Sequence, residues 1–202
     1  MSEADKVVSL GKLVLDFALI ERTTCRVDGS THETDTDHTV MLGVIACSLA
    51  AKLYPELSVG KIAQYALVHD LVEVYAGDTP AFNLSPDAQK EKEKREEKAM
   101  RQFERDFADQ TWLLETLRAY EKLADSEARF VKTLDKCMPK ITHVLNYGAE
   151  FRRKGRTKEE VSGFFERQHA ALAGGHGREF PELMTLMRVI MDQALSASFP
   201  NE

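Results

Sequence analysis

The chain has 202 residues, of which 43% are hydrophobic and 30% are charged, which is enough for one globular domain with a substantial core. Its formal net charge of −6 at pH 7 provides no basic face and therefore disfavours a nucleic-acid polymer as partner. The three cysteines form no CxxC pair and the first apolar stretch is interrupted by Lys12 and Asp16, so we expect no disulfide framework, no membrane span and a cytoplasmic location.

Helical periodicity dominates the chain and predicts an all-α fold of about seven or eight helices. A first helix is expected over about residues 5–20. A polar loop over 22–37 follows, which is too rich in Thr, Asp and Gly to predict regular structure. Thr36 or Asp37 then caps a helix over about 38–53.

The next helix begins after Ser58 and continues through His69 to a stop at Gly77. Asp78 and Pro80 belong to the turn beyond that stop.

A long helix with a mixed-charge, solvated surface begins at Ser85 and Pro86. Pro139 is expected to kink one of the later helices. These helices are expected over 112–123, 126–149, 157–173 and 181–196. Without repeats or long linkers, they predict one compact helical bundle over 1–202, with a core over 22–147 and C-terminal helices over 157–196 packing on it.

Four side chains within these helices are of the metal-ligand type: His38, the adjacent His69 and Asp70, and Asp135. They interrupt apolar helix faces, where an unpaired ionisable group is costly. A mixed nitrogen and oxygen set suits one divalent transition ion, Mn²⁺, Fe²⁺, Co²⁺, Ni²⁺ or Zn²⁺, better than Ca²⁺. The alternative is structural, because a histidine on an apolar helix face is usually a hydrogen-bonded core residue.

Two acids and two cations extend this candidate site. Glu73 follows His69 by four residues and projects to the same side of the helix, where it can orient or deprotonate a water on the ion. Asp78 can act as an acid on a leaving group, or it can simply be a turn residue. The planar fork of Arg22 matches phosphate oxygens, and Lys136 is a second candidate for that contact.

The pattern resembles the HD-domain metal-dependent phosphohydrolases, whose signature is an early His, an HD pair and a late Asp on separate helices. Residues 66–80, ALVHDLVEVYAGDTP, are similar to the HD-x-x-E-x-x-x-G-D pattern of the YfbR-like 5′-deoxynucleotidases. Residues 36–42, TDHTVML, are similar to the segment before their second helix. The resemblance extends over about 22–147.

The resemblance implies an all-α enzyme, frequently a homodimer, in which a metal-bound water removes phosphate from nucleoside 5′-monophosphates. It also implies the residue roles. The ligands would be His38, His69, Asp70 and Asp135, the catalytic acids Glu73 and Asp78, and the phosphate contact Arg22. Bacterial members often place a bulky aromatic after that arginine, close to the sugar, whereas Thr23 and Thr24 stand here.

Two other functions are compatible with the pattern. Guanosine polyphosphate pyrophosphohydrolases share the HD-x-x-E pattern, but they usually place an acid where Val74 stands, and Gly77 with Asp78 favours the nucleotidase branch. A non-catalytic HD domain that binds a nucleotide and a metal as a sensor is the second. The complete set of four ligands and two acids argues against it.

Overall fold

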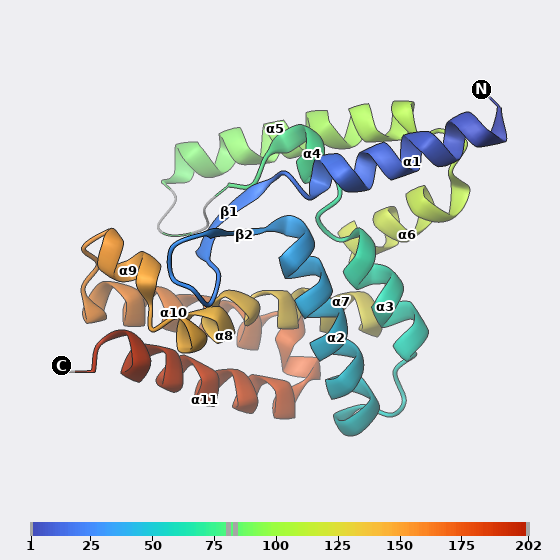
Figure 1. Cartoon of the computed structure of the whole chain (residues 1–202). Helices are drawn as coiled ribbons and strands as arrows, with labels where there is room; N and C mark the ends of the chain where they lie inside the picture. Colours follow the sequence, from blue (N-terminus) through green and yellow to red (C-terminus); the bar gives the residue numbers. More distant parts are fainter. Residues whose placement is uncertain (1, 80–81, 83–84, 201–202) are drawn as a thin grey trace.

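The structure, a computed structural model, describes residues 2–79, 82 and 85–200. Pro80, which the sequence assigns to the turn after Gly77, lies outside these residues. Helices dominate the described chain (Figure 1), as the sequence predicts. In chain order the elements are α1 (Glu3–Phe17), β1 (Glu21–Cys25), β2 (His32–Thr34), α2 (Asp35–Leu53), α3 (Val59–Val68), α4 (Glu73–Ala76), α5 (Pro86–Asp106), α6 (Thr111–Glu121), α7 (Ser126–Asp135), α8 (Met138–Leu145), α9 (Ala149–Arg153), α10 (Lys158–Gly174), the 3₁₀ helix η1 (His176–Glu179) and α11 (Pro181–Ser198).

The expectation of an irregular loop over 22–37 is wrong, because β1 and β2 pair there as an antiparallel hairpin. Asp28 and Gly29 make the turn: the Asp28 carboxylate accepts from the backbone N–H groups of Ser30 and Thr31, and Gly29 has a φ of 70°. An Asp-Gly pair is a common hairpin turn, and β-branched Thr favours the strand on one side of it.

The first turn of α2 starts earlier than predicted. Thr34, not Thr36 or Asp37, is the N-cap, and Asp37 closes a capping box with it. The helix therefore begins at Asp35, which puts Asp35 and His38 on the same buried face as Leu42.

The single helix predicted from Ser58 to Gly77 is interrupted between Val68 and Glu73. The backbone N–H of Leu71 bonds to the carbonyl of Val68, and that of Glu73 bonds to Asp70, so the spacing tightens from four residues to three. The interruption lies where the apolar contacts change direction. Ala66 packs in one hydrophobic cluster and Leu71 in the other.

The kink predicted from Pro139 is present as a break. α7 ends at Asp135, and α8 begins at Met138 with Pro139 in its first turn. The predicted helix over 126–149 is therefore two helices, α7 and α8, and α9 begins at its last residue. Together with the separate α4, these divisions are why the described helices outnumber the seven or eight expected.

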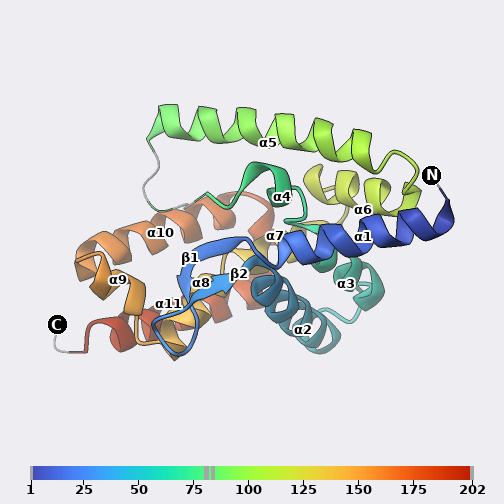
Figure 2. The same ribbon diagram turned by 45° about the horizontal axis from the view of Figure 1, so that its top comes forward.

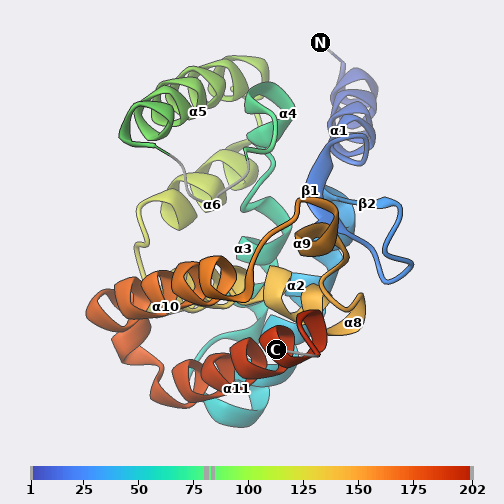
Figure 3. The same ribbon diagram turned by 90° about the vertical axis from the view of Figure 1, so that its left-hand side faces the viewer.

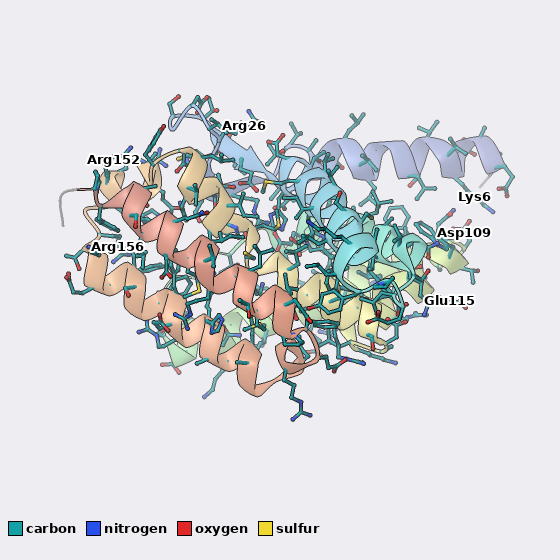
Figure 4. All side chains as sticks on the ribbon, turned by 90° about the horizontal axis from the view of Figure 1, so that it is seen from below. Lys6, Arg26, Asp109, Glu115, Arg152 and Arg156 are labelled. Carbon is teal, nitrogen blue, oxygen red and sulfur yellow. The ribbon has the colours of Figure 1, made fainter. Side chains whose placement is uncertain are left out.

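Two hydrophobic clusters hold these elements together. The larger joins α2, α3, α7, α8, α10 and α11, and the smaller joins α1, α5 and α6. Figures 2 and 3 show α5 and α1 on one side of the molecule and α10 and α11 side by side on the other. In Figure 4 the ion pair of Lys6 with Asp109, 3.0 Å apart, lies at one end of the molecule. Among the described helices, none is long and apolar enough to cross a membrane.

Candidate metal centre and cavity

The four predicted ligands come together from the start of one helix, from an interruption after a second helix and from the end of a third. His38 lies in the first turn of α2, His69 and Asp70 lie at the interruption after α3, and Asp135 is the last residue of α7. One donor atom from each lies within 4.8 Å of the others. Ligand atoms about 2 to 2.5 Å from one ion are separated by such distances.

The shortest contacts pair one imidazole with one carboxylate. His38 Nε2 lies 2.9 Å from Asp135 Oδ1, and His69 Nε2 lies 2.9 Å from Asp70 Oδ2. The cross distances, His38 to Asp70 and His69 to Asp135, are both 4.0 Å. The four donor atoms therefore surround one point rather than forming two separate pairs.

The chemistry of the donors fits a cation. His69 Nδ1 donates to the Ala66 carbonyl at 2.8 Å, so Nε2 is the ring nitrogen that faces the cluster. That nitrogen is buried and makes no hydrogen bond within the described part of the chain. A buried ring nitrogen between two carboxylates is costly unless a cation, either a proton or a metal ion, lies there.

The pKa values of the cluster residues also indicate a site for a cation. Burial disfavours the ionised carboxylates, yet His69 and His38 hold the pKa of Asp70 well below its usual range. Burial likewise opposes ionisation of Asp135, but Lys136 and His38 hold its pKa well below the ordinary value. Burial disfavours the imidazolium of His38, but its hydrogen bond to Asp135 raises its pKa to about 9. Without an ion, a proton on His38 thus occupies the position that a metal cation would take.

Arg22 lies beside this cluster on β1, held by carboxylates. Its Nη1 donates to Asp35 Oδ1 at 2.9 Å and to Asp70 Oδ2 at 3.4 Å. Burial alone would lower its pKa, but the carboxylates of Asp70 and Asp78 raise it above the ordinary value. Arg22 therefore stays charged next to the candidate metal centre.

Glu73 and Asp78 both line the same cavity as Asp70. Burial, together with the charge of Asp70, raises the pKa of Glu73 to about 10, so the carboxyl is protonated at neutral pH unless a cation is close. Its Oε2 is buried and lacks a hydrogen-bond partner within the described chain. Gly77, with a φ of 71°, ends α4 and turns the chain so that Asp78 faces the cavity.

The cavity over the cluster has a volume of about 750 Å³, which suits a small-molecule ligand. Lys136 lines it but is engaged, because its Nζ lies 2.8 Å from Asp135 Oδ2. One turn further on, Lys140 donates to the Lys136 carbonyl and to Gln168 Oε1, both at 2.7 Å. Burial lowers the pKa of Lys140 to about 8.

Sequence reasoning missed two acidic residues next to the cluster. Asp35 is fully buried against Arg22, and Glu33 is 4% exposed on β2. Asp35 precedes His38 by three residues, which is the spacing of one helix face and the signal that would have found it. Glu33 carries no such signal, because its inward direction depends on the hairpin.

The fold is largely helical, and its helix ends bring a His/Asp cluster to a cavity, with an arginine and two further acids beside it. These features define a class of metal-binding helical proteins. Within that class the assignment is specific. A family model of the HD domain matches residues 19–174, so the chain belongs to the HD domain family.

Curated relatives carry one common name. The chain is 28% identical over its whole length to 5′-deoxynucleotidase HDDC2 of Xenopus laevis, and the match covers 97% of that protein. It is 35% and 34% identical to the proteins of the same name from Bos taurus and Homo sapiens. Those two matches cover 52% of this chain and 50% of each relative.

Solved structures share the fold. A protein described as a predicted metal-dependent phosphohydrolase from Magnetospirillum magnetotacticum superimposes with a TM-score of 0.71 at 25% identity, covering 96% of this chain and 97% of that one. A conserved hypothetical protein from Pyrococcus furiosus has a TM-score of 0.53 at 23% identity, over 88% and 98% of the two chains. The second likeness concerns the fold alone.

Proposed function

We propose that this protein is a metal-dependent phosphohydrolase that removes phosphate from nucleoside 5′-monophosphates. The observation that carries the proposal is one cavity lined by His69, Asp70 and Asp135 of the cluster together with Arg22 and Glu73. His38 completes the cluster as a fully buried residue. The name of the full-length Xenopus relative, a 5′-deoxynucleotidase, supports the nucleotide as substrate.

His38, His69, Asp70 and Asp135 are the proposed ligands of one divalent ion, and two imidazoles with two carboxylates favour Mn²⁺, Fe²⁺, Co²⁺, Ni²⁺ or Zn²⁺. Such an ion acts as a Lewis acid and lowers the pKa of water in the site. The protein supplies the fixed geometry. His69 is oriented by the Ala66 carbonyl, and Asp135 is held by Lys136.

Arg22 is the proposed phosphate contact. It lines the cavity as a permanently charged guanidinium, and its carboxylate partners hold it next to Asp70. A planar guanidinium donates two parallel hydrogen bonds to a phosphate and offsets the negative charge that develops on the phosphoryl oxygens. Lys136 contributes a second positive charge at the Asp135 side, although Asp135 already pairs with it.

Glu73 and Asp78 are the proposed proton-transfer groups. With a cation bound, the raised pKa of Glu73 would fall, and the ionised carboxylate would accept a proton from the attacking water. Asp78 stands beyond α4 on the same cavity, where it can protonate the departing sugar oxygen.

A substrate panel tests this function. Ribo- and 2′-deoxynucleoside 5′-monophosphates and guanosine polyphosphates are each incubated with the protein and Mn²⁺ or Co²⁺, and released phosphate and pyrophosphate are measured. We expect phosphate from monophosphates and none in the presence of a chelator. Release of pyrophosphate from the guanosine polyphosphates alone favours the pyrophosphohydrolase function. If none of the compounds is hydrolysed, the proposal that the protein is an enzyme is contradicted.

Replacing Glu73 with Gln should lower kcat by about 10²- to 10⁴-fold, the usual contribution of a proton-transfer group. The amide has nearly the same shape and cannot accept the proton. Because Glu73 is not a proposed ligand, metal content measured by atomic emission should equal that of the wild type. Glu56→Gln, at an exposed loop position, is the matched control, and a Glu73→Gln variant as active as that control contradicts the role.

We further propose that residues 1–202 form one domain, that it is a homodimer and that it acts in the cytoplasm. Residues of the C-terminal helices share one hydrophobic cluster with α2 and α3, which supports the single domain. The cytoplasm is supported by three free cysteines.

The homodimer is supported by a shallow apolar groove on α2, where Val40 is 58% and Val44 63% exposed. Light scattering after size-exclusion chromatography should give twice the chain mass for the wild type. Val44→Arg should give one chain mass, whereas Val189→Arg, at a 48% exposed valine of α11, should leave the dimer intact. A monomeric wild type contradicts the proposal.

A further inference from the structure

Glu33 is a buried acid on β2 to which neither the family pattern nor the proposed mechanism assigns a role. It is 4% exposed, and a carboxylate removed from water to this extent is costly unless polar groups surround it. Its Oε1 lies 3.4 Å from His38 Nδ1 and 3.7 Å from Arg22 Nε. One oxygen atom thus faces both a proposed metal ligand and the proposed phosphate contact.

The two histidines of the cluster differ in what orients them. His69 Nδ1 donates to a backbone carbonyl of its own helix, that of Ala66. His38 presents Nε2 to the cluster, and its Nδ1 is buried without a well-aligned hydrogen bond in the described chain, with the Glu33 carboxylate beside it. When Nε2 of a neutral imidazole binds a metal, Nδ1 must carry the hydrogen, and that N–H needs an acceptor. Glu33 is the acceptor in position.

Arg22 needs the same carboxylate for a different reason. Its Nη1 bonds to Asp35 and Asp70, but its buried Nε makes no hydrogen bond to the residues that the structure describes. Glu33 Oε1 is the acidic oxygen facing that side of the fork. The other oxygen of Glu33, Oε2, accepts from the Thr142 hydroxyl at 3.4 Å, which anchors the carboxylate to α8.

The hairpin explains why these groups meet. Glu21 pairs with Thr34 and Cys25 pairs with His32, with an irregularity between the two pairs, and Arg22 and Glu33 lie on the two strands between them. Glu33 is also five residues before His38, on the strand that leads directly into α2. The hairpin therefore links the phosphate contact to the metal ligand through one side chain.

We propose that Glu33 is a positioning residue. Its contact with His38 Nδ1 orients the imidazole so that Nε2 can bind the metal, and its contact with Arg22 Nε orients the guanidinium for phosphate binding. The phosphate half rests on the proposed function, whereas the metal half does not depend on it.

The variant Glu33→Gln tests both halves. It keeps the size of the side chain but removes the charge, so the oxygen that faces both donors becomes a weaker acceptor. We expect Mn²⁺, titrated calorimetrically into the metal-free protein, to bind about 10- to 100-fold more weakly, the usual effect of losing such a partner. The Co²⁺-loaded variant should show shifted visible absorption bands, because the ligand orientation changes. Inorganic phosphate should inhibit the Mn²⁺-loaded variant more weakly than it inhibits the wild type.

The matched control is Glu21→Gln, an exposed acid on the same hairpin, which should leave all three measurements unchanged. A folded Glu33→Gln protein with wild-type Mn²⁺ affinity and an unaltered Co²⁺ spectrum overturns the proposal. Weaker metal binding with unchanged phosphate inhibition overturns the Arg22 half.

A measurement on the unmodified protein covers the case in which Glu33→Gln fails to fold. In ¹⁵N-histidine-labelled protein loaded with Zn²⁺, His38 should carry its proton on Nδ1 and show slow exchange of that proton with water. Rapid exchange of the Nδ1 proton with water overturns the proposal, because a metal on Nε2 places the proton on Nδ1 whether or not Glu33 accepts it. Because neither this experiment nor the metal titration involves turnover, the metal half is decided even if no nucleotide is hydrolysed.

Discussion

Asp70→Ala is expected to reduce metal-dependent phosphate release by about 10³-fold or more, because it removes both a ligand and a neighbour of the phosphate contact. Asp70 Oδ2 lies 2.9 Å from His69 Nε2 and 3.4 Å from Arg22 Nη1, so one carboxylate joins the two parts of the site. The loss should appear in kcat at saturating Mn²⁺, and metal content measured by atomic emission should fall with it.

Asp192→Ala is the control, since that aspartate is exposed on α11 and far along the chain from the proposed ligands. It should retain wild-type kcat and metal content. An Asp70→Ala protein that still binds one ion per chain and hydrolyses nucleotides at the control rate would remove Asp70 from the ligand set.

Arg22→Ala should destabilise the metal-free protein by about 3 to 5 kcal/mol, the usual cost of breaking a buried ion pair on one side. The guanidinium side chain is 13% exposed, and its removal leaves Asp35, which is fully buried, without its charged partner. The free energy of unfolding is measured by urea denaturation in the presence of a chelator. In the metal-loaded variant the KM for the nucleotide should also rise, because the phosphate loses its fork.

Arg26→Ala provides the comparison within the same hairpin. Arg26 pairs with Asp37 at 2.6 Å, but its side chain is 46% exposed, so the loss of stability should be much smaller than that of Arg22→Ala. Arg22→Lys should fall between the two variants, because a lysine keeps the charge but cannot reproduce the planar fork. Equal stabilities of the Arg22→Ala and Arg26→Ala proteins would show that the buried carboxylates do not need Arg22.

The sequence was sufficient for the helices and for the ligand candidates, because both depend on local spacing. His38 and Leu42 recur on one helix face, and the His69-Asp70 pair with Glu73 one turn later follows the same rule. Local spacing was insufficient for the backbone break at His69, which lies where the packing changes from one hydrophobic cluster to the other. The break after Asp135 was signalled by Pro139.

The hairpin was missed for a different reason. Residues 22–37 have the polar composition that is typical of a loop. Because the paired strands are short, this composition concealed the hairpin turn signal of Asp28 and Gly29. Missing the hairpin also meant missing Glu33, since only strand pairing turns that side chain toward Arg22 and His38. Glu33 was therefore the residue beside the cluster that only the hairpin, and not helical periodicity, could place.

The proposed ligands all lie where a helix starts, is interrupted or ends, so a bound ion would link distant parts of the chain. His38 and Asp135 are 97 residues apart in sequence, so an ion held between them closes a long loop as a covalent cross-link would. The described cysteines are all free, and the ion would be the strongest tie across these helix ends. Loss of the metal should therefore loosen α2, α3 and α7 together, long before the apolar clusters beneath them separate.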